Sequence, residues 1–469
     1  MKGKLLVLSL FLMGLNAFSQ DGSLDVPFNI SGTAYMRCLQ KLSNGKIIAT
    51  HANSTTGGIK YYNADATNFT FTFQTPPQQT GFSNNWIQDI VEQPDGKILF
   101  IGANNAPEIF RYHADGTLDS QFQANLGTGV DMKPYKAIVE PNGKIVVIGA
   151  FTSFNGTSKG CIFRLNADGT LDPSFVATGT PSSVGITDII RLADGKFMIT
   201  GPNIAVFNGV SRLSSTMRLE NDGSVDTSYQ ADQGANFVKI ALQSDNTIIG
   251  AGDSFMWKLN PNGTQVNFGP FISIGGNTIQ INQGNSSGKI AGLHVQNDNK
   301  IIITGTFNKI SGTTVPNHII RFNADGTIDP TFSIGTGPGQ EIYTSQLTDD
   351  GKILIGGVFF TYNGVARNYI ARLNNNTPPL FSENLLASQE FIKNETQLTV
   401  YPNPTNGVFT IQTSNKMLGG QVQITSILGQ NIKTFAIMDT EMQADLHQGI
   451  YIIEIEKDGT KARQKLIVK

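Results

Sequence analysis

Short runs of apolar residues, each preceded by a tight polar turn, recur along most of the chain. A typical copy is the turn Pro94-Asp95-Gly96, followed by the apolar run Ile98–Ile101. Asp followed by Gly suits a type I turn closed by a left-handed residue, because glycine tolerates a positive φ. The closing position, Gly or a replacing Asn, falls at residues 45, 96, 143, 195, 246, 299 and 351, at spacings of 51, 47, 52, 51, 53 and 52. The pattern predicts seven units, each with a hairpin at this turn.

A second turn phrase alternates with the first. It reads RLNADGTLD at residues 164–172, and related copies begin at Arg111, Arg218, Lys258 and Arg321. Two hairpins in each unit make four short antiparallel strands, and roughly four to eight such units are typical of a β-propeller. We therefore predict an all-β protein whose residues 20–378 form a seven-bladed β-propeller with four-stranded blades.

The two ends of the repeat region complement each other. The last unit stops after Arg372-Leu373-Asn374, without its Asp-Gly turn and fourth strand. The phrase Asp21-Gly22-Ser23-Leu24-Asp25 stands alone near the N-terminus. We predict that this N-terminal segment pairs with the strand around residues 370–374 and closes the last blade, because closure removes an open sheet edge.

The N-terminus has the features of an export signal. Lys2 and Lys4 precede the apolar run at residues 5–15, and Ala17-Phe18-Ser19 places small residues at a cleavage site. We predict a signal peptide over residues 1–19. No later stretch is long and apolar enough for a transmembrane helix, so we expect an exported chain without a transmembrane segment.

Composition agrees with this picture and excludes one class of partner. The chain has 50 Gly and only 15% charged residues, as expected for short strands joined by turns. Its net charge of −2 argues against a nucleic-acid partner. Cys38 and Cys161 fall at different points of different repeats, which favours two buried thiols but leaves a disulfide open.

The turn phrases resemble the delta-60 repeat family of bacterial surface and secreted proteins, over roughly residues 21–378. The resemblance implies a propeller and specifies neither ligand nor activity. Beyond it, residues 379–395 have a linker's composition. Residues 396–469 contain several short strands separated by turn residues, which predicts a small β-sandwich.

The C-terminal segment resembles the type A sorting domain of the type IX secretion system of Bacteroidota. An opening Tyr-Pro-Asn-Pro-x-x-Gly, a Leu-Gly-Gln turn and a Gly-Ile-Tyr strand carry the resemblance; their motif residues are Tyr401, Pro402, Asn403, Pro404, Gly407, Gly429, Gly449 and Tyr451. The family implies recognition by an outer-membrane translocon, followed by release or by attachment to surface lipopolysaccharide. We therefore expect a secreted or surface location. An ordinary accessory β-sandwich is the alternative.

Charged residues recur with the second turn phrase. An arginine and the aspartate eight residues later fall opposite each other across the turn, which predicts structural cross-strand ion pairs rather than a site repeated in most blades. The pairs are Arg111–Asp119, Arg164–Asp172, Arg218–Asp226 and Arg321–Asp329, with Arg372–Asp25 formed across the ring closure.

No motif for catalysis, a cofactor or a metal stands out. The turn phrase has oxygen ligands at alternating positions but lacks the terminal Glu of a calcium loop, so calcium remains a less favoured alternative. The histidines, at positions 51, 113, 294, 318 and 447, do not have metal-ligand spacing. We therefore predict no catalytic residue, no cofactor and no metal.

Loops that break the repeat are the natural place for binding. One insertion is around residues 272–287, and Trp86 and Trp257 are either buried or available to stack on a sugar. The sequence thus favours a secreted or surface, non-catalytic binding protein exported by the type IX system, with an unidentified glycan or protein ligand. The alternative is an extracellular propeller hydrolase or lyase acting on a polysaccharide.

Overall fold

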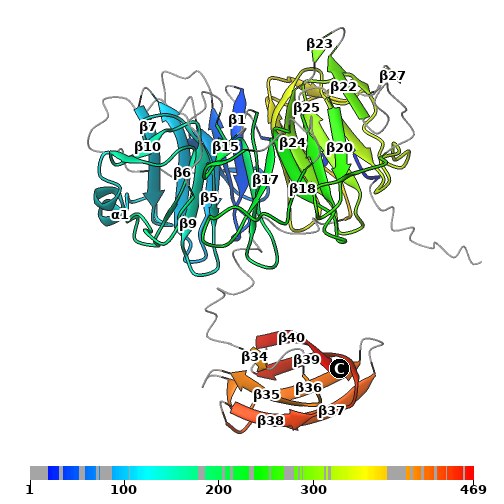
Figure 1. Cartoon of the computed structure of the whole chain (residues 1–469). Helices are drawn as coiled ribbons and strands as arrows, with labels where there is room; N and C mark the ends of the chain where they lie inside the picture. The colour runs from blue at the N-terminus through cyan, green and yellow to red at the C-terminus, as the bar shows by residue number, and fades with distance from the viewer. Residues whose placement is uncertain are drawn as a thin grey trace, which may run out of the picture. The chain divides into compact units, whose positions relative to one another are not determined.

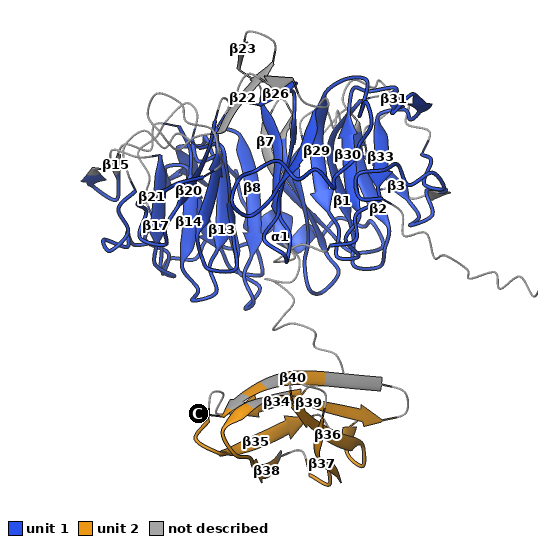
Figure 2. Ribbon diagram, turned by 90° about the vertical axis from the view of Figure 1, so that its right-hand side faces the viewer, with its two compact units in different colours: residues 1–386 blue, residues 387–469 orange. Residues whose placement is uncertain are grey.

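The chain divides into two compact units, residues 1–386 and 387–469, which Figure 2 distinguishes by colour. The predicted signal peptide and the predicted linker at 379–395 lie outside the residues that the computed structural model describes. Those are residues 20–30, 35–51, 59–69, 73, 87–104, 106–177, 185–202, 206–211, 215–231, 237–252, 255–268, 279–283, 286–287, 289–310, 313–314, 318–377, 398–401, 405–413, 417–426, 430–439, 441–457 and 460–468.

The first unit consists of antiparallel hairpins, and each first-phrase turn joins two of its strands, as predicted. The closing residue has a positive φ, from 63° at Asn246 to 89° at Gly195. The paired strands are β1 (Met36–Lys41) with β2 (Ile47–His51), β5 (Ile87–Glu92) with β6 (Ile98–Asn104), β8 (Pro134–Val139) with β9 (Ile145–Gly149), β13 (Asp188–Arg191) with β14 (Phe197–Thr200), β18 (Lys239–Leu242) with β19 (Ile248–Ala251), β24 (Ile290–Val295) with β25 (Ile301–Gly305), and β29 (Ile342–Leu347) with β30 (Ile353–Gly357).

A third strand pairs with the second strand of each hairpin. These third strands are β3 (Ile59–Tyr62), β7 (Ala106–Tyr112), β12 (Ile162–Leu165), β17 (Thr216–Leu219), β20 (Phe255–Leu259), β28 (Ile319–Phe322) and β33 (Ile370–Leu373). The predicted fourth strand is a two-residue strand in two repeats, β4 (Asn68–Phe69) and β21 (Gln265–Val266). In four others it shortens to a single bridge, such as Leu165 to Leu171, because the chain turns away at the next aspartate.

The first strands of the hairpins are innermost and form a closed ring. Each of these strands contacts the next one in the order β1, β5, β8, β13, β18, β24, β29, and β29 contacts β1. The first unit is therefore a β-propeller (Figure 1). The count of seven blades stays a prediction from the repeat spacing.

The N-terminal segment completes the last blade, as predicted. Leu24 bridges Leu373, and the Gly22 amide donates to the Asn374 carbonyl at 2.7 Å. The Asp25 amide donates to the Arg372 carbonyl at 2.8 Å. The equivalent bonds in an uninterrupted copy join Gly116 to His113 and Asp119 to Arg111. The two ends of the repeat region thus rebuild one copy of the turn phrase.

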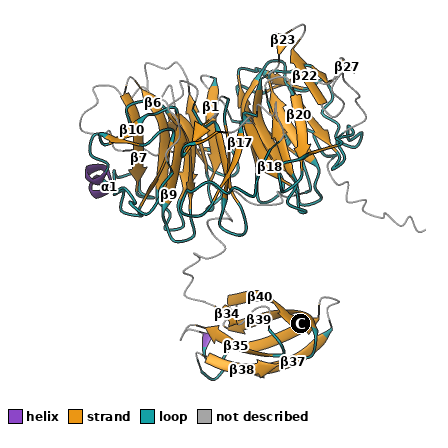
Figure 3. Ribbon diagram, in the orientation of Figure 1, coloured by secondary structure: helices purple, strands orange, loops and turns teal. Residues whose placement is uncertain are grey.

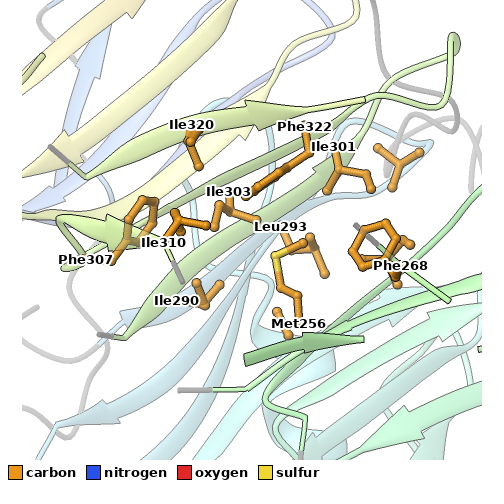
Figure 4. Close-up of a cluster of buried hydrophobic side chains, with 13 residues drawn as sticks. Met256, Phe268, Ile290, Leu293, Ile301, Ile303, Phe307, Ile310, Ile320 and Phe322 are labelled. Atoms are coloured by element: carbon orange, nitrogen blue, oxygen red, sulfur yellow. The ribbon is translucent and has the colours of Figure 1, made fainter. Parts of the chain in front are cut away.

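The hydrophobic core of this unit lies between neighbouring repeats. In the cluster of Figure 4, Met256 of β20 packs with Ile290 and Leu293 of β24 and with Ile303 of β25. Met256 and Ile303 are fully buried. Alternate residues of each sheet face one neighbour or the other, so each repeat needs both neighbours to bury its apolar residues.

The two turn phrases share one end of the propeller, because successive strands run in opposite directions; we call this end the turn face. At the other end, the bulge face, the innermost strands begin and short hairpins join the second and third strands. These hairpins are β10 (Ser153–Phe154) with β11 (Thr157–Ser158), β15 (Val206–Phe207) with β16 (Val210–Ser211), β26 (Lys309–Ile310) with β27 (Thr313–Thr314), and β31 (Thr361–Tyr362) with β32 (Val365–Ala366).

Two features depart from the repeat. Part of the predicted insertion forms β22 (Ile279–Gln283) and β23 (Ser286–Ser287), and β22 pairs with both β20 and β26, so it links two repeats through backbone hydrogen bonds. A short helix that the sequence pattern did not predict, α1 (Ser120–Asn125), is drawn in purple in Figure 3. The Asp119 carboxylate caps it by accepting from the Phe122 amide.

The second unit is a small two-sheet β-domain, as predicted. One sheet has the order β34 (Leu398–Tyr401), β35 (Val408–Thr413), β38 (Glu441–Asp445). The other has the order β37 (Asn431–Ala436), β36 (Gln421–Ser426), β39 (Gly449–Lys457), β40 (Thr460–Val468). Apolar side chains of both sheets, including Ile411, Val422 and Ile453, form one buried cluster.

Candidate functional site

The five arginines of the second turn phrase each lie beside the aspartate that the sequence pairs with them. The distances between arginine Nε and aspartate Oδ2 are 3.0 Å for Arg111–Asp119, 2.7 Å for Arg164–Asp172, Arg218–Asp226 and Arg321–Asp329, and 2.8 Å for Arg372–Asp25. A lysine from the first turn phrase joins several pairs; Lys144 Nζ, for example, lies 2.8 Å from Asp172.

Each of these arginines also contacts an aromatic ring and the next repeat. The Arg164 guanidinium lies 4.8 Å from the Phe175 ring centroid and donates to the Asn221 carbonyl at 2.7 Å. Arg218 stacks on Tyr229 and donates to the Pro261 carbonyl at 2.8 Å. The arginine is therefore well placed to stabilise the contact between one repeat and the next.

The aspartates are held in their charged form. Burial alone would raise the pKa of Asp172, but hydrogen bonds from Lys144, Ser174 and Arg164 hold this pKa well below its usual range. The pKa of Asp226 is depressed in the same way by Lys196, Ser228 and Arg218. Carboxylates with such depressed pKa values are poor proton acceptors at neutral pH.

The bulge face carries a backbone feature that the repeat pattern did not predict. Five innermost strands have a β-bulge near their first residue, and the bulge residues are Arg37, Gln88, Tyr135, Ala291 and Tyr343. Each lies eight positions before a turn-closing residue, as 37 does before 45 and 343 does before 351. The offset ties the bulges to the repeat but does not mark them by itself, because position 187 has the same offset and the pairing of β13 with β14 has no register shift. Bulges re-aim side chains, and this backbone position carries an arginine, a glutamine, an alanine or a tyrosine, depending on the repeat.

Three neighbouring bulges surround the candidate functional site, which we call the bulge-face pocket. The pocket has a volume of about 600 Å³. Six of its lining residues form three pairs spaced by two: Tyr35 and Arg37 at the start of β1, Lys289 and Ala291 at β24, and Glu341 and Tyr343 at β29. The residues between the members of each pair, Met36, Ile290 and Ile342, are buried and anchor the strands.

Polar contacts organise this pocket. The Tyr343 hydroxyl donates to Glu341 Oε2 at 3.0 Å. Burial, together with this hydrogen bond and the Glu341 charge, raises the pKa of Tyr343, so the phenol stays protonated at neutral pH. His318 does not line the pocket; burial lowers the pKa of its imidazole, and the charge of Glu341 opposes this shift.

A second polar group lies beyond the bulges, on the innermost strands β24 and β29 and on the second strand β25. His294 Nε2 is 2.8 Å from Ser345 Oγ, and Ser345 Oγ is 2.7 Å from Thr304 Oγ1. Gly292 makes room for this contact, because a Cβ at that position would lie 2.0 Å from Ser345 Oγ. A serine beside a histidine is the arrangement from which a nucleophile can be activated.

The other residues singled out in the sequence occupy varied places. Cys38 and Cys161 are both buried and are not joined in a disulfide, and burial strongly raises the pKa of Cys38. Trp257 packs in a half-buried position against Phe237 and Phe255, whereas Trp86 is outside the described residues. Among the described residues, no group of three or more His, Cys, Asp or Glu side chains is arranged to hold a metal ion.

In the C-terminal unit, some of the motif residues are described. Tyr401 ends β34, and Gly407 precedes β35 with φ 125°. The Tyr451 ring lies over Gly449, and its hydroxyl donates to the His447 carbonyl at 2.9 Å. Four other motif residues fall outside the described part: Pro402, Asn403, Pro404 and Gly429.

Comparison with protein families settles the nature of this unit. Residues 399–469 match the model of the secretion system C-terminal sorting domain. The C-terminal unit is a sorting domain. Four segments of the first unit match the model of a β-propeller described as a domain of unknown function (DUF5122), at residues 93–122, 140–175, 296–332 and 348–376. No curated protein matches the chain.

Several solved structures are similar to the chain. PorZ, described as an essential bacterial surface component of the type IX secretion system of Porphyromonas gingivalis, is 14% identical with a TM-score of 0.46; the match covers 94% of this chain and 60% of PorZ. YCF48 from Cyanidioschyzon merolae is 12% identical with a TM-score of 0.46, covering 74% of this chain and 98% of YCF48. A streptogramin B lyase is 15% identical with a TM-score of 0.40, covering 74% of this chain and 96% of the lyase.

The sorting domain gives the destination of the chain. It directs export by the type IX secretion system to the cell surface or the extracellular space, and it implies contact with that system. The predicted location is thereby confirmed. Among the described residues, no helix combines the length and apolar character needed to cross a lipid bilayer.

Proposed function

We propose that the propeller is a non-catalytic binding module carried to the cell surface or released by the sorting domain, and that its ligand site is the bulge-face pocket. The observation that carries the proposal is the set of three residue pairs around one pocket. Its volume of about 600 Å³ lies within the roughly 300–1,000 Å³ of typical ligand sites.

The contrast between repeated and varied side chains supports this placement. The arginines and aspartates of the second turn phrase recur in most repeats, and the arginines contact the neighbouring repeat, as residues with an architectural role do. The pocket residues Arg37, Ala291 and Tyr343 share a backbone position but differ in chemistry. Variation at a fixed backbone position is how a repeat protein acquires a specific site.

A second candidate function is hydrolysis of ester-linked substituents on an extracellular polysaccharide. The contact between His294 Nε2 and Ser345 Oγ favours it, because histidine could act as general base for a serine nucleophile. Both side chains lie on innermost strands and are half-buried. Glycosidic bonds are less suited to this pair, since their cleavage generally uses two carboxylates.

The test is a binding screen of the exported chain, from residue 20 onward, on glycan and protein arrays. The pocket variants are Lys289→Gln and Tyr343→Ala. Their matched controls are Lys133→Gln and Tyr135→Ala, which change the equivalent positions of β8. We expect a ligand whose binding falls about tenfold in the pocket variants only. If the control variants lose as much affinity as the pocket variants, or if none of the four variants changes the affinity, the bulge-face pocket is not the ligand site.

An assay of ester hydrolysis distinguishes the second candidate function from the first. Release of acyl groups from a polysaccharide by the wild type, abolished in Ser345→Ala and retained in Thr304→Val, would replace the binding function with the hydrolase. Absence of turnover on an acylated-polysaccharide panel, together with binding that survives Ser345→Ala, would support the non-catalytic function.

A further inference from the structure

We infer that the bulge-face pocket takes a sugar carrying a carboxylate, so that its ligand is an acidic polysaccharide built with uronic acids. The inference rests on the proposed binding function and names its ligand class. It follows from the charges, the aromatic rings and the space that the three strand starts bring together.

The pocket is cationic in an otherwise slightly acidic chain. Its described lining residues include two cations, Arg37 and Lys289, and one carboxylate, Glu341, which leaves one formal positive charge. The whole chain has a net charge of −2. Arg37 belongs to β1 and Lys289 precedes β24, and both strands contact β29 between them. An anion bound over β29 would therefore have Arg37 on one side and Lys289 on the other.

The Glu341 carboxylate of the pocket already has a partner. Glu341 Oε2 accepts the hydrogen bond of the Tyr343 hydroxyl at 3.0 Å, which directs part of its charge toward the phenol. The Arg37 guanidinium offers paired donors whose geometry matches a carboxylate, and the Lys289 ammonium adds a point charge. One carboxylate of a ligand would thus be recognised by two different cations.

The tyrosines suit a sugar ring better than a purely ionic ligand. Tyr343 is 36% exposed although it lies on an innermost strand, and Tyr35 is half-buried beside it in the pocket lining. Aromatic faces pack well against apolar C–H surfaces while their hydroxyls hydrogen-bond. Ala291 at the third bulge leaves space that a larger side chain would fill. A carbohydrate with one acidic group per residue combines these requirements.

The equivalent positions of two other repeats lack this combination. The bulges of β5 and β8 present Gln88 and Tyr135, and no arginine. Lys133 matches Lys289 in backbone position, since the carbonyls of both accept from the amide that follows the second strand. The chain therefore contains its own control site, with a lysine and a tyrosine but without Arg37 and Glu341.

The experiment measures binding of oligogalacturonate, oligoglucuronate and oligomannuronate to the full exported chain by calorimetry. Their methyl esters are the neutral counterparts with the same sugar rings. We expect binding of at least one acid series, weakened about tenfold or more by esterification and by added salt. Arg37→Gln and Lys289→Gln should each weaken it about tenfold, whereas Lys133→Gln should not. Because Lys289 is exposed, its variant tests the inference even if Arg37→Gln fails to fold.

Failure of this inference is distinguishable from failure of the proposed function. Equal binding of the acids and their methyl esters, or tight binding of a neutral glycan or a protein that depends on Tyr343, would overturn the acidic-sugar inference and leave the binding function standing. If binding of none of the glycans or arrayed proteins depends on the pocket residues, the acidic-sugar inference and the proposed binding function are both wrong.

Discussion

On the turn face, Arg164 and Arg218 make nearly the same contacts in two different repeats, with an aspartate, an aromatic ring and the next repeat's carbonyl. On the bulge face, Ala291 and Tyr343 occupy one backbone position in two repeats and share no chemistry. The first face holds neighbouring repeats together, which every repeat must do. The second has no such common task, so its side chains are free to differ and to form a local site.

The largest expected effect comes from removing the most buried arginine of the turn face. The Arg321 side chain is 2% exposed and contacts both Asp329 and Asp21 at 2.7 Å. Breaking a buried ion pair by removing one partner costs about 3–5 kcal/mol. Asp21 and Asp329 would both lose the guanidinium, although Lys300 Nζ stays 3.0 Å from Asp329 Oδ2. We expect Arg321→Ala to lower the propeller's free energy of unfolding by this amount in urea denaturation. Arg218→Ala should cost less, since that side chain is 16% exposed; equal losses would contradict the ranking.

The ring closure gives the next largest effect. Gly22 has φ +87°, and a Cβ there would lie 2.9 Å from Ile334 Cγ2 and 3.1 Å from the Ser333 backbone. We expect Gly22→Ala to destabilise the propeller by about 2–4 kcal/mol, from backbone strain and overpacking together. Gly129→Ala is the matched control, because Gly129 has φ +68° with nothing within 4 Å of its added Cβ. Gly129→Ala should lower the free energy of unfolding by about 1 kcal/mol in urea denaturation.

Acid should weaken the turn face. The pKa of Asp172 in the folded chain is depressed below its unfolded value, so its contribution is fully present above about pH 4 and is lost as the pH falls through the folded pKa. We expect Asp172→Asn to cost about 2 kcal/mol at pH 7, and this difference from the wild type to shrink steadily below pH 4. Unfolding free energies measured at several pH values check it. If the difference in unfolding free energy between wild type and Asp172→Asn stays constant or grows in acid, Asp172 does not stabilise the fold through its charge.

Changes in the bulge-face pocket should have the smallest effect on stability. Lys289 is exposed and Tyr343 is 36% exposed, so Lys289→Gln and Tyr343→Phe should each change the free energy of unfolding by less than about 0.5 kcal/mol. A loss above about 1 kcal/mol would show that these residues support the fold and would erase the contrast between the faces.

Much of the turn face was predictable from the sequence, because its contacts are local. The prediction of hairpins at Gly96 and Gly143 needed only neighbouring residues, and the ion pair of Arg164 with Asp172 spans eight. The prediction nevertheless missed one copy of the second phrase. In the first repeat, Asn63 to Thr67 form the same turn with Ala66 at φ 74°, and Tyr61 pairs with Phe69 where other repeats have an ion pair.

The sequence by itself determined the repeat, the turns, the complementary ends and the sorting domain, since each depends on residues close together in the chain or on a family motif. Only the tertiary structure decided the bulge-face pocket. Arg37 and Tyr343 are about 300 residues apart, and they meet because the ring brings β29 against β1. Each bulge also depends on the register between two strands, which no single residue encodes. A site built from far-separated strands therefore becomes visible once the ring is closed.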